Sequence, residues 1–446
     1  MVADRIAPEN IEERLVFGAI VGCWGFYAIG ALYLVGPILA MMLVGLHFWR
    51  MYAAAWRPGT PMAQPVPFGV WVWIVGMLGM LLALLAAHSG QDLGLGQTIK
   101  SSIGWLKGWA LMALFPLAGA CLRIRPALLV RASSWFAVQT LAITPFLVAA
   151  ALVHLPSRLF TSPFQLIGGP GPEFFAVYLY IVDPSNGALR WQFVAPWAPA
   201  AGMLGNMMFV FACFETDKRL RALALFAAVM ICFMTKSRMA MLFLVVYPPL
   251  LWTAARLARP AMMAAGAAIS VLGGVIAGPV IDAVQNAVAA FRSARMDSTR
   301  VREALGRIAT TRWWEEAPIW GHGIVERGPH HVEFMPIGSH HTWFGLLFVK
   351  GIVGALSLAI PMAWTVIELL LLSQVSAVGR MGLSIVVMLI FYSFGENLEI
   401  LAYLFWPGLM VMGSGFAEAA MGRTRSVEAP KPLLEALPVG DVVLRA

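Results

Sequence analysis

Residues 66–87 read VPFGVWVWIVGMLGMLLALLAA, an apolar run without a single charge. About 20 apolar residues in a helix are enough to cross the hydrocarbon core of a bilayer. Similar runs recur along the chain, in which 60% of the residues are hydrophobic and only 12% are charged. A soluble chain of 446 residues would need more charge to solvate its surface. The sequence therefore predicts an all-α, polytopic membrane protein.

About twelve spans are predicted from these runs. They lie near 15–32, 35–52, 66–87, 105–122, 133–153, 197–214, 222–235, 239–255, 261–280, 343–373, 381–396 and 401–418. The first two form one apolar run that is expected to turn near Gly36–Pro37. The run 343–373 is too long for one ordinary crossing. We expect its first part to be shallow or re-entrant, with the crossing after Gly351.

The spans divide the chain into four regions. Residues 1–281 hold spans one to nine and a segment outside the membrane near 154–196, which contains a β-like run, Phe174–Val182. Residues 282–341 form a large loop, and 342–421 hold the last three spans. The tail, 422–446, combines Pro with mixed charge, which predicts disorder.

Basic residues in the short loops predict the orientation, because they are enriched on the cytoplasmic side. They fall on one face: Arg50, Arg57, Arg123, Arg125, Arg131, Lys218, Arg219, Arg221, Arg256, Arg259, Arg380, Arg423 and Arg425. With twelve spans, both termini are then cytoplasmic, and 154–196 and 282–341 lie on the opposite face. The net charge of +8 is spread over these loops. A nucleic-acid partner requires clustered charge on one soluble face, so none is expected.

The most informative stretch, residues 300–354, reads RVREALGRIATTRWWEEAPIWGHGIVERGPHHVEFMPIGSHHTWFGLLFVKGIVG. Its arginines either form a solvated helix face paired with nearby carboxylates or meet an anionic ligand at the membrane surface. Guanidinium groups suit a diphosphate, which they bind through forked, charge-assisted hydrogen bonds. A histidine just before a span is well placed for proton transfer, because neutral imidazole accepts a proton near physiological pH.

This stretch resembles the O-antigen ligase and O-antigen polymerase superfamily of bacterial cell-envelope glycosyltransferases. In that family a Pro-x-x-Gly-x-Gly element, here Pro318–Gly323, precedes a membrane-boundary His and then a Gly-x-x-Gly, here Gly351–Gly354. The family His lies eleven residues before the first Gly, which selects His340. His341, in place of the polar residue that usually follows, is a candidate for substrate binding. Ser237–Arg238 is similar to the family's Ser-Arg at a span end.

The resemblance implies a metal-independent, inverting glycosyl transfer without a cofactor. The donor would be a glycan on undecaprenyl diphosphate, and the acceptor would be lipid A-core or a growing glycan. His340 would be the catalytic base or acceptor-orienting group. Arg238 and Arg300 would hold the diphosphate, with Arg302 as the alternative to Arg300 because the alignment of the loop is loose. The protein would lie in the bacterial inner membrane, with its active site on the periplasmic face.

Other polar residues are weaker candidates for the functional site, and Arg190 and Glu396 are candidates for substrate binding. Arg190 precedes the sixth span, where family members often carry an arginine, and Glu396 ends the eleventh span. Either Glu396 contacts substrate or it is simply interfacial. His330, His331 and Glu333 form an HHxE cluster with too few ligands for a metal site. The 17 tryptophans, several of them at span ends, predict an aromatic belt.

Several functions remain open from the sequence. The leading one is a ligase that attaches a glycan to lipid A-core, and the closest alternative is a polymerase that uses the same donor. A protein-glycosylating relative is a third possibility. A transporter or flippase is the rival from another class, but it should carry ionisable groups or broken helices near mid-span. In this sequence Arg238, Arg300, His340 and Glu396 gather at one predicted face.

Overall fold

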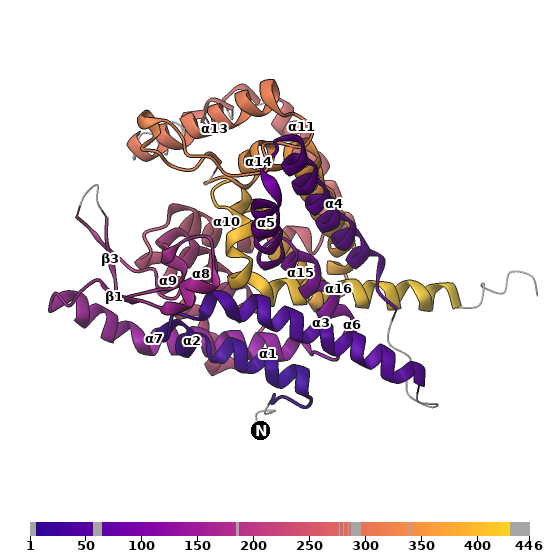
Figure 1. Ribbon diagram of the computed structural model, residues 1–446. Helices are drawn as coiled ribbons and strands as arrows, with labels where there is room; N and C mark the ends of the chain where they lie inside the picture. Colours follow the sequence, from indigo (N-terminus) through magenta and orange to yellow (C-terminus); the bar gives the residue numbers. More distant parts are fainter. Residues whose placement is uncertain are drawn as a thin grey trace, which may run out of the picture.

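The computed structural model describes residues 6–56, 65–183, 187–275, 277–279, 281–283, 285–286, 296–338 and 340–428, and they are mainly helical (Figure 1). The helices are α1 (Ile11–Val21), α2 (Cys23–Ala28), α3 (Leu32–Trp56), α4 (Phe68–Gly90), α5 (Gly94–Lys107), α6 (Leu111–Cys121), α7 (Pro126–Leu152), α8 (Ala198–Cys213), α9 (Lys218–Met234), α10 (Arg238–Ala254), α11 (Pro260–Val275), α13 (Met296–Glu316), α14 (Thr342–Ser373), α15 (Ala377–Ser393) and α16 (Leu398–Glu428).

Within the described ranges, six helical segments are long and apolar enough to cross a membrane. They are α3, α4, Gly94–Cys121 (α5 with α6), α7, α14 and Leu398–Gly422 of α16. The chain is therefore a helical membrane protein, as the sequence predicts. Every predicted span overlaps a helix, but α8, α10 and α15 have only 16 or 17 residues. The number of twelve crossings and the orientation stay predictions.

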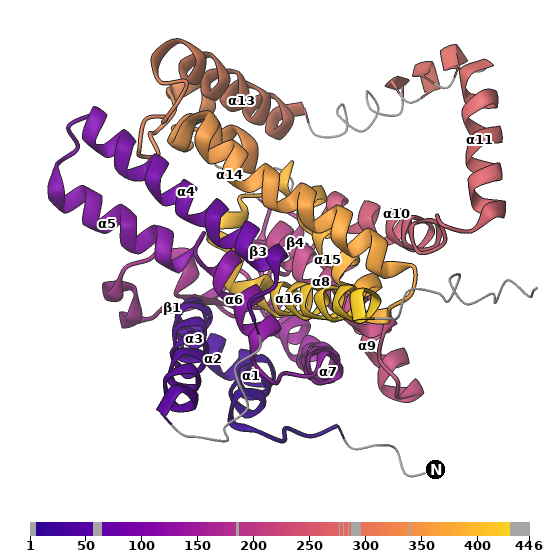
Figure 2. The ribbon, with the colours of Figure 1, turned by 90° about the vertical axis from the view of Figure 1, so that its right-hand side faces the viewer.

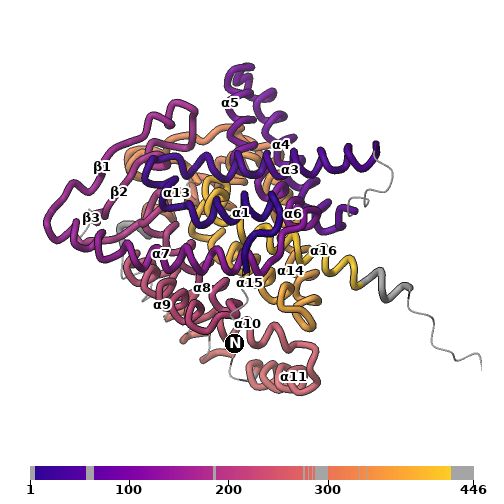
Figure 3. Tube along the Cα trace, turned by 90° about the horizontal axis from the view of Figure 1, so that it is seen from below, coloured from indigo at the N-terminus to yellow at the C-terminus, as the bar shows by residue number. Residues whose placement is uncertain are grey.

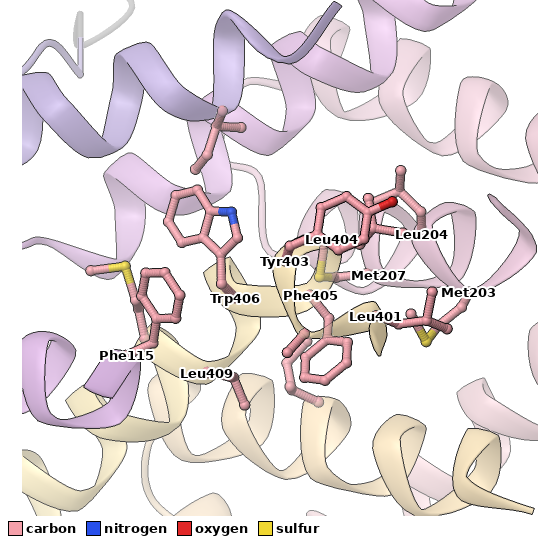
Figure 4. Packing of buried hydrophobic residues seen from close by; sticks show 14 of the residues in the cluster. Phe115, Met203, Leu204, Met207, Leu401, Tyr403, Leu404, Phe405, Trp406 and Leu409 are labelled. Carbon is pink, nitrogen blue, oxygen red and sulfur yellow. The ribbon is translucent and has the colours of Figure 1, made fainter. Parts of the chain in front are cut away.

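The most buried of the long helices is α16, which packs against α6, α15 and α14, while its C-terminal end projects beyond the other helices (Figure 3). Its Trp406 stacks on Phe115 of α6, with the ring centroids 5.0 Å apart (Figure 4). Glycine lets these two helices approach closely: a Cβ on Gly119 would lie 2.1 Å from the carbonyl oxygen of Met410. Small residues at a helix contact allow close packing in membranes, where the hydrophobic effect does not drive helices together.

The first predicted turn lies elsewhere than expected. Gly36 and Pro37 lie inside α3, and the chain turns at Gly30, which has a left-handed φ of 66°. A Cβ on Gly30 would lie 2.5 Å from the carbonyl oxygen of Phe175, so the contact with the segment 154–196 fixes this turn. The prediction of Gly36–Pro37 was wrong because no local pattern reports that contact.

Short strands form at one edge of the molecule, where the sequence has its β-like run (Figure 3). The strand β1 (Arg158–Thr161) pairs with β2 (Ala176–Tyr178), and β3 (Ile181–Val182) pairs with β4 (Leu189–Arg190), both antiparallel. The expectation of a β-like run over Phe174–Val182 is thus confirmed in part, because Phe174 ends a short 3-10 helix, Pro172–Phe174, and the strands cover 176–178 and 181–182. At the C-terminus, the expected disorder is wrong for 422–428, which continue α16, and 429–446 lie outside the described residues.

Helix α14 is broken at Gly351, where φ is 61° and ψ is −164°, a combination that only glycine adopts readily. The part after the break, Ile352–Ser373, has about the 20 residues that a membrane crossing needs. The sequence anticipates this break, whereas the shallow or re-entrant position of the first part stays a prediction.

The Pro-x-x-Gly-x-Gly segment lies against the break and forms hydrogen bonds with the backbone groups that the break leaves unpaired. The hydrogen bonds that replace the helical ones run from the N–H of His322 to Phe348 O (2.9 Å), Gly323 to Val349 O (2.9 Å), Ile352 to Pro318 O (3.0 Å) and Val353 to Ile319 O (3.3 Å). Backbone groups inside a membrane protein must be paired, because little water is present to satisfy them. The motif and the Gly-x-x-Gly that follows it are therefore two halves of one structural unit.

Candidate functional site

His340 and His341 precede the first residue of α14 and have different surroundings. His341 is the N-cap: its Nδ1 accepts a hydrogen bond of 3.3 Å from the N–H of Phe344. Its ring also stacks on Phe344, with centroids 4.0 Å apart, and meets the edge of Phe394. His341 therefore has a structural role. His340 is half-buried and lies within electrostatic reach of Arg302.

Glu396 lies in the turn between α15 and α16 and is 3% exposed. Its Oε2 accepts a 2.9 Å hydrogen bond from Nε1 of Trp197, the N-cap residue of α8. Its carbonyl oxygen accepts a 2.6 Å bond from the hydroxyl of Thr342, two residues after His340. These bonds tie the start of α14 to the starts of α8 and α16, so His340 and Glu396 lie in one region.

Arg302 of α13 is exposed, and its charge acts on both His340 and Glu396. Helix α13 lies over the first turns of α14 in both side views (Figures 1 and 2). Arg300 is also exposed, but two residues along a helix turn a side chain by about 200°. Of the two alternatives that the sequence left open, Arg302 is thus the one that faces the histidine.

Arg238 is half-buried and is the first residue of α10, which Ser237 caps. The next residue, Met239, packs directly on Gly395, beside Glu396: a Cβ on Gly395 would lie 2.2 Å from the Met239 sulfur. The start of α10 therefore adjoins the turn that carries Glu396. Arg238, Arg302, His340 and Glu396 come from four elements that meet at one end of the helices, and we call them the candidate site.

Arg190, predicted as a substrate contact, holds the turn that presents Arg238. Its guanidinium donates to the carbonyl oxygen of Thr235 (3.1 Å) and pairs with Asp183 across a distance of 3.3 Å. Both partners lie within the β3–β4 hairpin or the α9–α10 turn. These contacts give Arg190 a positioning role at the turn that precedes Arg238.

Burial shifts the pKa values of His340 and Glu396 in opposite directions, whereas the charge of Arg302 lowers both. Burial, together with the positive charge of Arg302, lowers the pKa of His340 to about 4, so the imidazole is neutral at pH 7. Burial raises the pKa of Glu396 to about 7, although the Trp197 hydrogen bond and Arg302 favour its ionised form. The site thus combines a neutral imidazole, a carboxyl group that titrates near neutrality, and two guanidinium groups.

A cluster of polar side chains that the sequence did not predict fastens α13 to the break in α14. His322 contacts the carbonyl oxygen of Phe348 through Nδ1 (2.9 Å) and Glu316 through Nε2 (2.7 Å). Arg312 donates to Glu316 and to Glu326, and the hydrogen bonds from Arg312 and His322 lower the pKa of Glu316 to about 2. The spacing of Arg312 and Glu316, four residues apart on a helix, was the available signal.

Two tryptophans donate specific hydrogen bonds, a role that the expected aromatic belt does not include. Trp197 binds Glu396, and Trp343 donates a 2.9 Å hydrogen bond to the hydroxyl of Ser393.

Within the described ranges, no group of three or more His, Cys, Asp or Glu residues is arranged to hold a metal ion. His330 begins a short 3-10 helix, His330–Val332, and Glu333 follows it with a left-handed φ of 58°.

The sequence was also compared with known proteins. It matches no model of a protein family, and it matches no protein of curated function.

Proposed function

We propose that this chain is a membrane glycosyltransferase that moves a glycan from an undecaprenyl diphosphate carrier to an acceptor hydroxyl. The observation that carries the proposal is the meeting of Arg302, His340 and Glu396 at one end of the helices, beside the start of α10 with Arg238. Lipid-linked diphosphates have their reactive bond at the membrane surface, where these helices end. The motif resemblance supports the same reaction.

In the proposed reaction, the acceptor oxygen attacks the anomeric carbon of the donor glycan. The bond from that carbon to the diphosphate oxygen breaks, and the configuration inverts. His340 takes the hydroxyl proton, and the lipid diphosphate leaves with the bonding electron pair. Arg238 and Arg302 face the charge that builds on the leaving oxygens, where fixed cations have their largest catalytic effect.

The low pKa of His340 is compatible with this role. A base must be unprotonated before it can accept a proton, and burial with Arg302 ensures that at neutral pH. A bound diphosphate brings negative charge next to Arg302 and raises the pKa of His340 toward neutrality, where a base is more effective. Proton acceptance is therefore coupled to donor binding.

We propose a ligase, with lipid A-core as the acceptor, in the inner membrane and with the site on the periplasmic face. The test is a lipopolysaccharide gel of a deletion strain, together with extraction of its lipid-linked glycans. Loss of all long chains while lipid-linked polymer accumulates is the expected result. Core that carries a single repeat unit would identify a polymerase instead. Loss of long chains with the lipid-linked glycan trapped on the cytoplasmic face, and not on the periplasmic face, would overturn the enzyme proposal in favour of a transporter.

A further inference from the structure

A second group of cations lies at the opposite end of the same helices. The helix α10 begins at Arg238 and ends at Ala254, and α14 runs from Thr342, next to His340, to Ser373. At their far ends, Ala255, Arg256, Arg259, Gln374 and Arg380 line a pocket of about 350 Å³. Three guanidinium groups from two inter-helix junctions thus share one cavity on the membrane face away from the candidate site.

The wall of this pocket is fixed by hydrogen bonds. The side chain of Gln374 donates to the carbonyl oxygen of Ala254 (2.8 Å) and accepts from the N–H of Ala258 (3.2 Å). Arg380 donates to the carbonyl oxygen of Ser373 (3.3 Å). These bonds join the end of α10 to the α14–α15 junction, so the cavity is formed before any ligand binds.

The pocket lacks the carboxylates that balance other arginines near the same face. The paired arginines there are Arg50 with Glu12 (2.5 Å), Arg125 with Glu13 (2.8 Å) and Arg131 with Glu215 (2.9 Å). By contrast, no carboxylate forms an ion pair with Arg256, Arg259 or Arg380 in the part of the chain that the structure describes. Arginines that only set orientation need no common cavity. A cavity that three arginines share, without a carboxylate to balance their charge, favours the binding of an anion.

Two exposed apolar side chains lie beside residues of the pocket. Val375, next to Gln374, is 85% exposed, and Trp252 is 52% exposed with Arg256 lying 4.7 Å above its ring. An exposed tryptophan beside an arginine at a helix end is typical of the membrane–water interface. We propose that the pocket binds the phosphodiester headgroup of an anionic phospholipid, whose acyl chains lie along Val375 and Trp252. Guanidinium groups bind phosphate oxygens through forked hydrogen bonds.

The test is lipid binding by the purified full-length protein in a neutral detergent, followed by native mass spectrometry with phosphatidylglycerol and with phosphatidylcholine. One variant combines Arg256→Gln, Arg259→Gln and Arg380→Gln. The matched control combines Lys218→Gln, Arg219→Gln and Arg221→Gln, which remove the same charge from the exposed start of α9, near the same face. Ionic strength of 0.15 M screens charges more than about 8 Å from the lipid.

We expect phosphatidylglycerol, and not phosphatidylcholine, to bind the wild type and the control variant. Each pocket arginine removed should weaken phosphatidylglycerol binding by about fivefold. Equal binding by both triple variants would overturn the proposal, because only diffuse charge would then matter. Inorganic phosphate that raises the melting temperature as much as phosphatidylglycerol would identify a site for free anions and not for lipid. Should the triple variant fail to fold, Arg380→Gln alone must still show its fivefold loss. None of these readouts depends on glycosyl transfer.

Discussion

The indole N–H of Trp197 donates a 2.9 Å hydrogen bond to the side chain of Glu396, a carboxyl group that is otherwise buried at the junction of α15 and α16. Burial raises the pKa of Glu396 to about 7, above the value of about 4.3 that an unfolded Glu has. The protonated form is therefore favoured by folding. Its stabilising effect is complete below the unfolded pKa and is lost as the pH rises through 7.

Replacing Glu396 by Gln should remove this pH dependence. Gln keeps an oxygen for the Trp197 N–H and cannot ionise, so Glu396→Gln should melt at close to the same temperature as the wild type at pH 4, below the unfolded pKa, and at a higher temperature at pH 8.5. Thermal unfolding in detergent across this range is the measurement. Parallel curves for the two proteins would mean that the pKa of Glu396 is the same in the folded and unfolded states, which would contradict the raised pKa.

The two adjacent histidines should respond differently to substitution. His340→Ala should lower the rate of glycan transfer by about 10²–10⁴-fold, the usual contribution of a positioned base. His341→Asn should be tolerated, since Asn is a good N-cap and can replace the bond to the Phe344 N–H. Transfer by purified variants from a lipid-linked donor measures both. If His341→Asn is inactive and His340→Ala is active, the assignment of the base is wrong.

Arg302 and Arg300 form a matched pair on α13. Arg302→Ala should slow transfer by about 10- to 100-fold, because a hydrogen-bonded charge is lost at the diphosphate. Arg300→Ala, on the other side of the helix, should stay within about twofold of the wild type. Arg302→Gln should also move the acid limb of the pH–rate profile to higher pH, since Arg302 lowers the pKa of His340. An acid limb that stays at the same pH would show that Arg302 does not lower the pKa of His340.

Gly351 should tolerate no side chain. A Cβ there would lie 2.2 Å from the carbonyl oxygen of Ile319, and φ is left-handed. Gly351→Ala should therefore greatly reduce the monodisperse fraction of extracted protein in size-exclusion chromatography. Gly45→Ala is the control in α3, because nothing lies within 4 Å of the added Cβ. Equal profiles would show that the break in α14 is not needed for folding.

The orientation can be tested with reporters. A reporter fused after Arg221 or at the C-terminus should be active only in the cytoplasm, and one within 300–330 only in the periplasm, because of the Lys and Arg distribution. A cytoplasmic signal from 300–330 would contradict the predicted topology and the proposed function together.

The sequence by itself determined the membrane class, the helical segments and the break at Gly351. Each follows from local properties: uninterrupted apolar runs, charge at their ends, and a glycine inside a run that is too long. The Pro-x-x-Gly-x-Gly and Gly-x-x-Gly elements were also visible. The sequence did not show that the two elements form one structural unit, since the hydrogen bonds between Pro318–Gly323 and the broken helix join residues that are far apart in the chain.

Only the tertiary structure decided which polar residues act together. The sequence placed Arg300 ahead of Arg302, and the packing of α13 on α14 turns Arg302 toward His340 and Glu396. From the sequence, Trp197 was expected to be part of an aromatic belt, whereas the fold brings its indole to the carboxyl group of Glu396, about 200 residues away. The sequence also predicted the first turn at Gly36–Pro37, whereas the chain turns at Gly30. The physical reason is common to all three. Side-chain direction, pairing and burial arise from contacts between distant segments, and a linear pattern records only what neighbouring residues require.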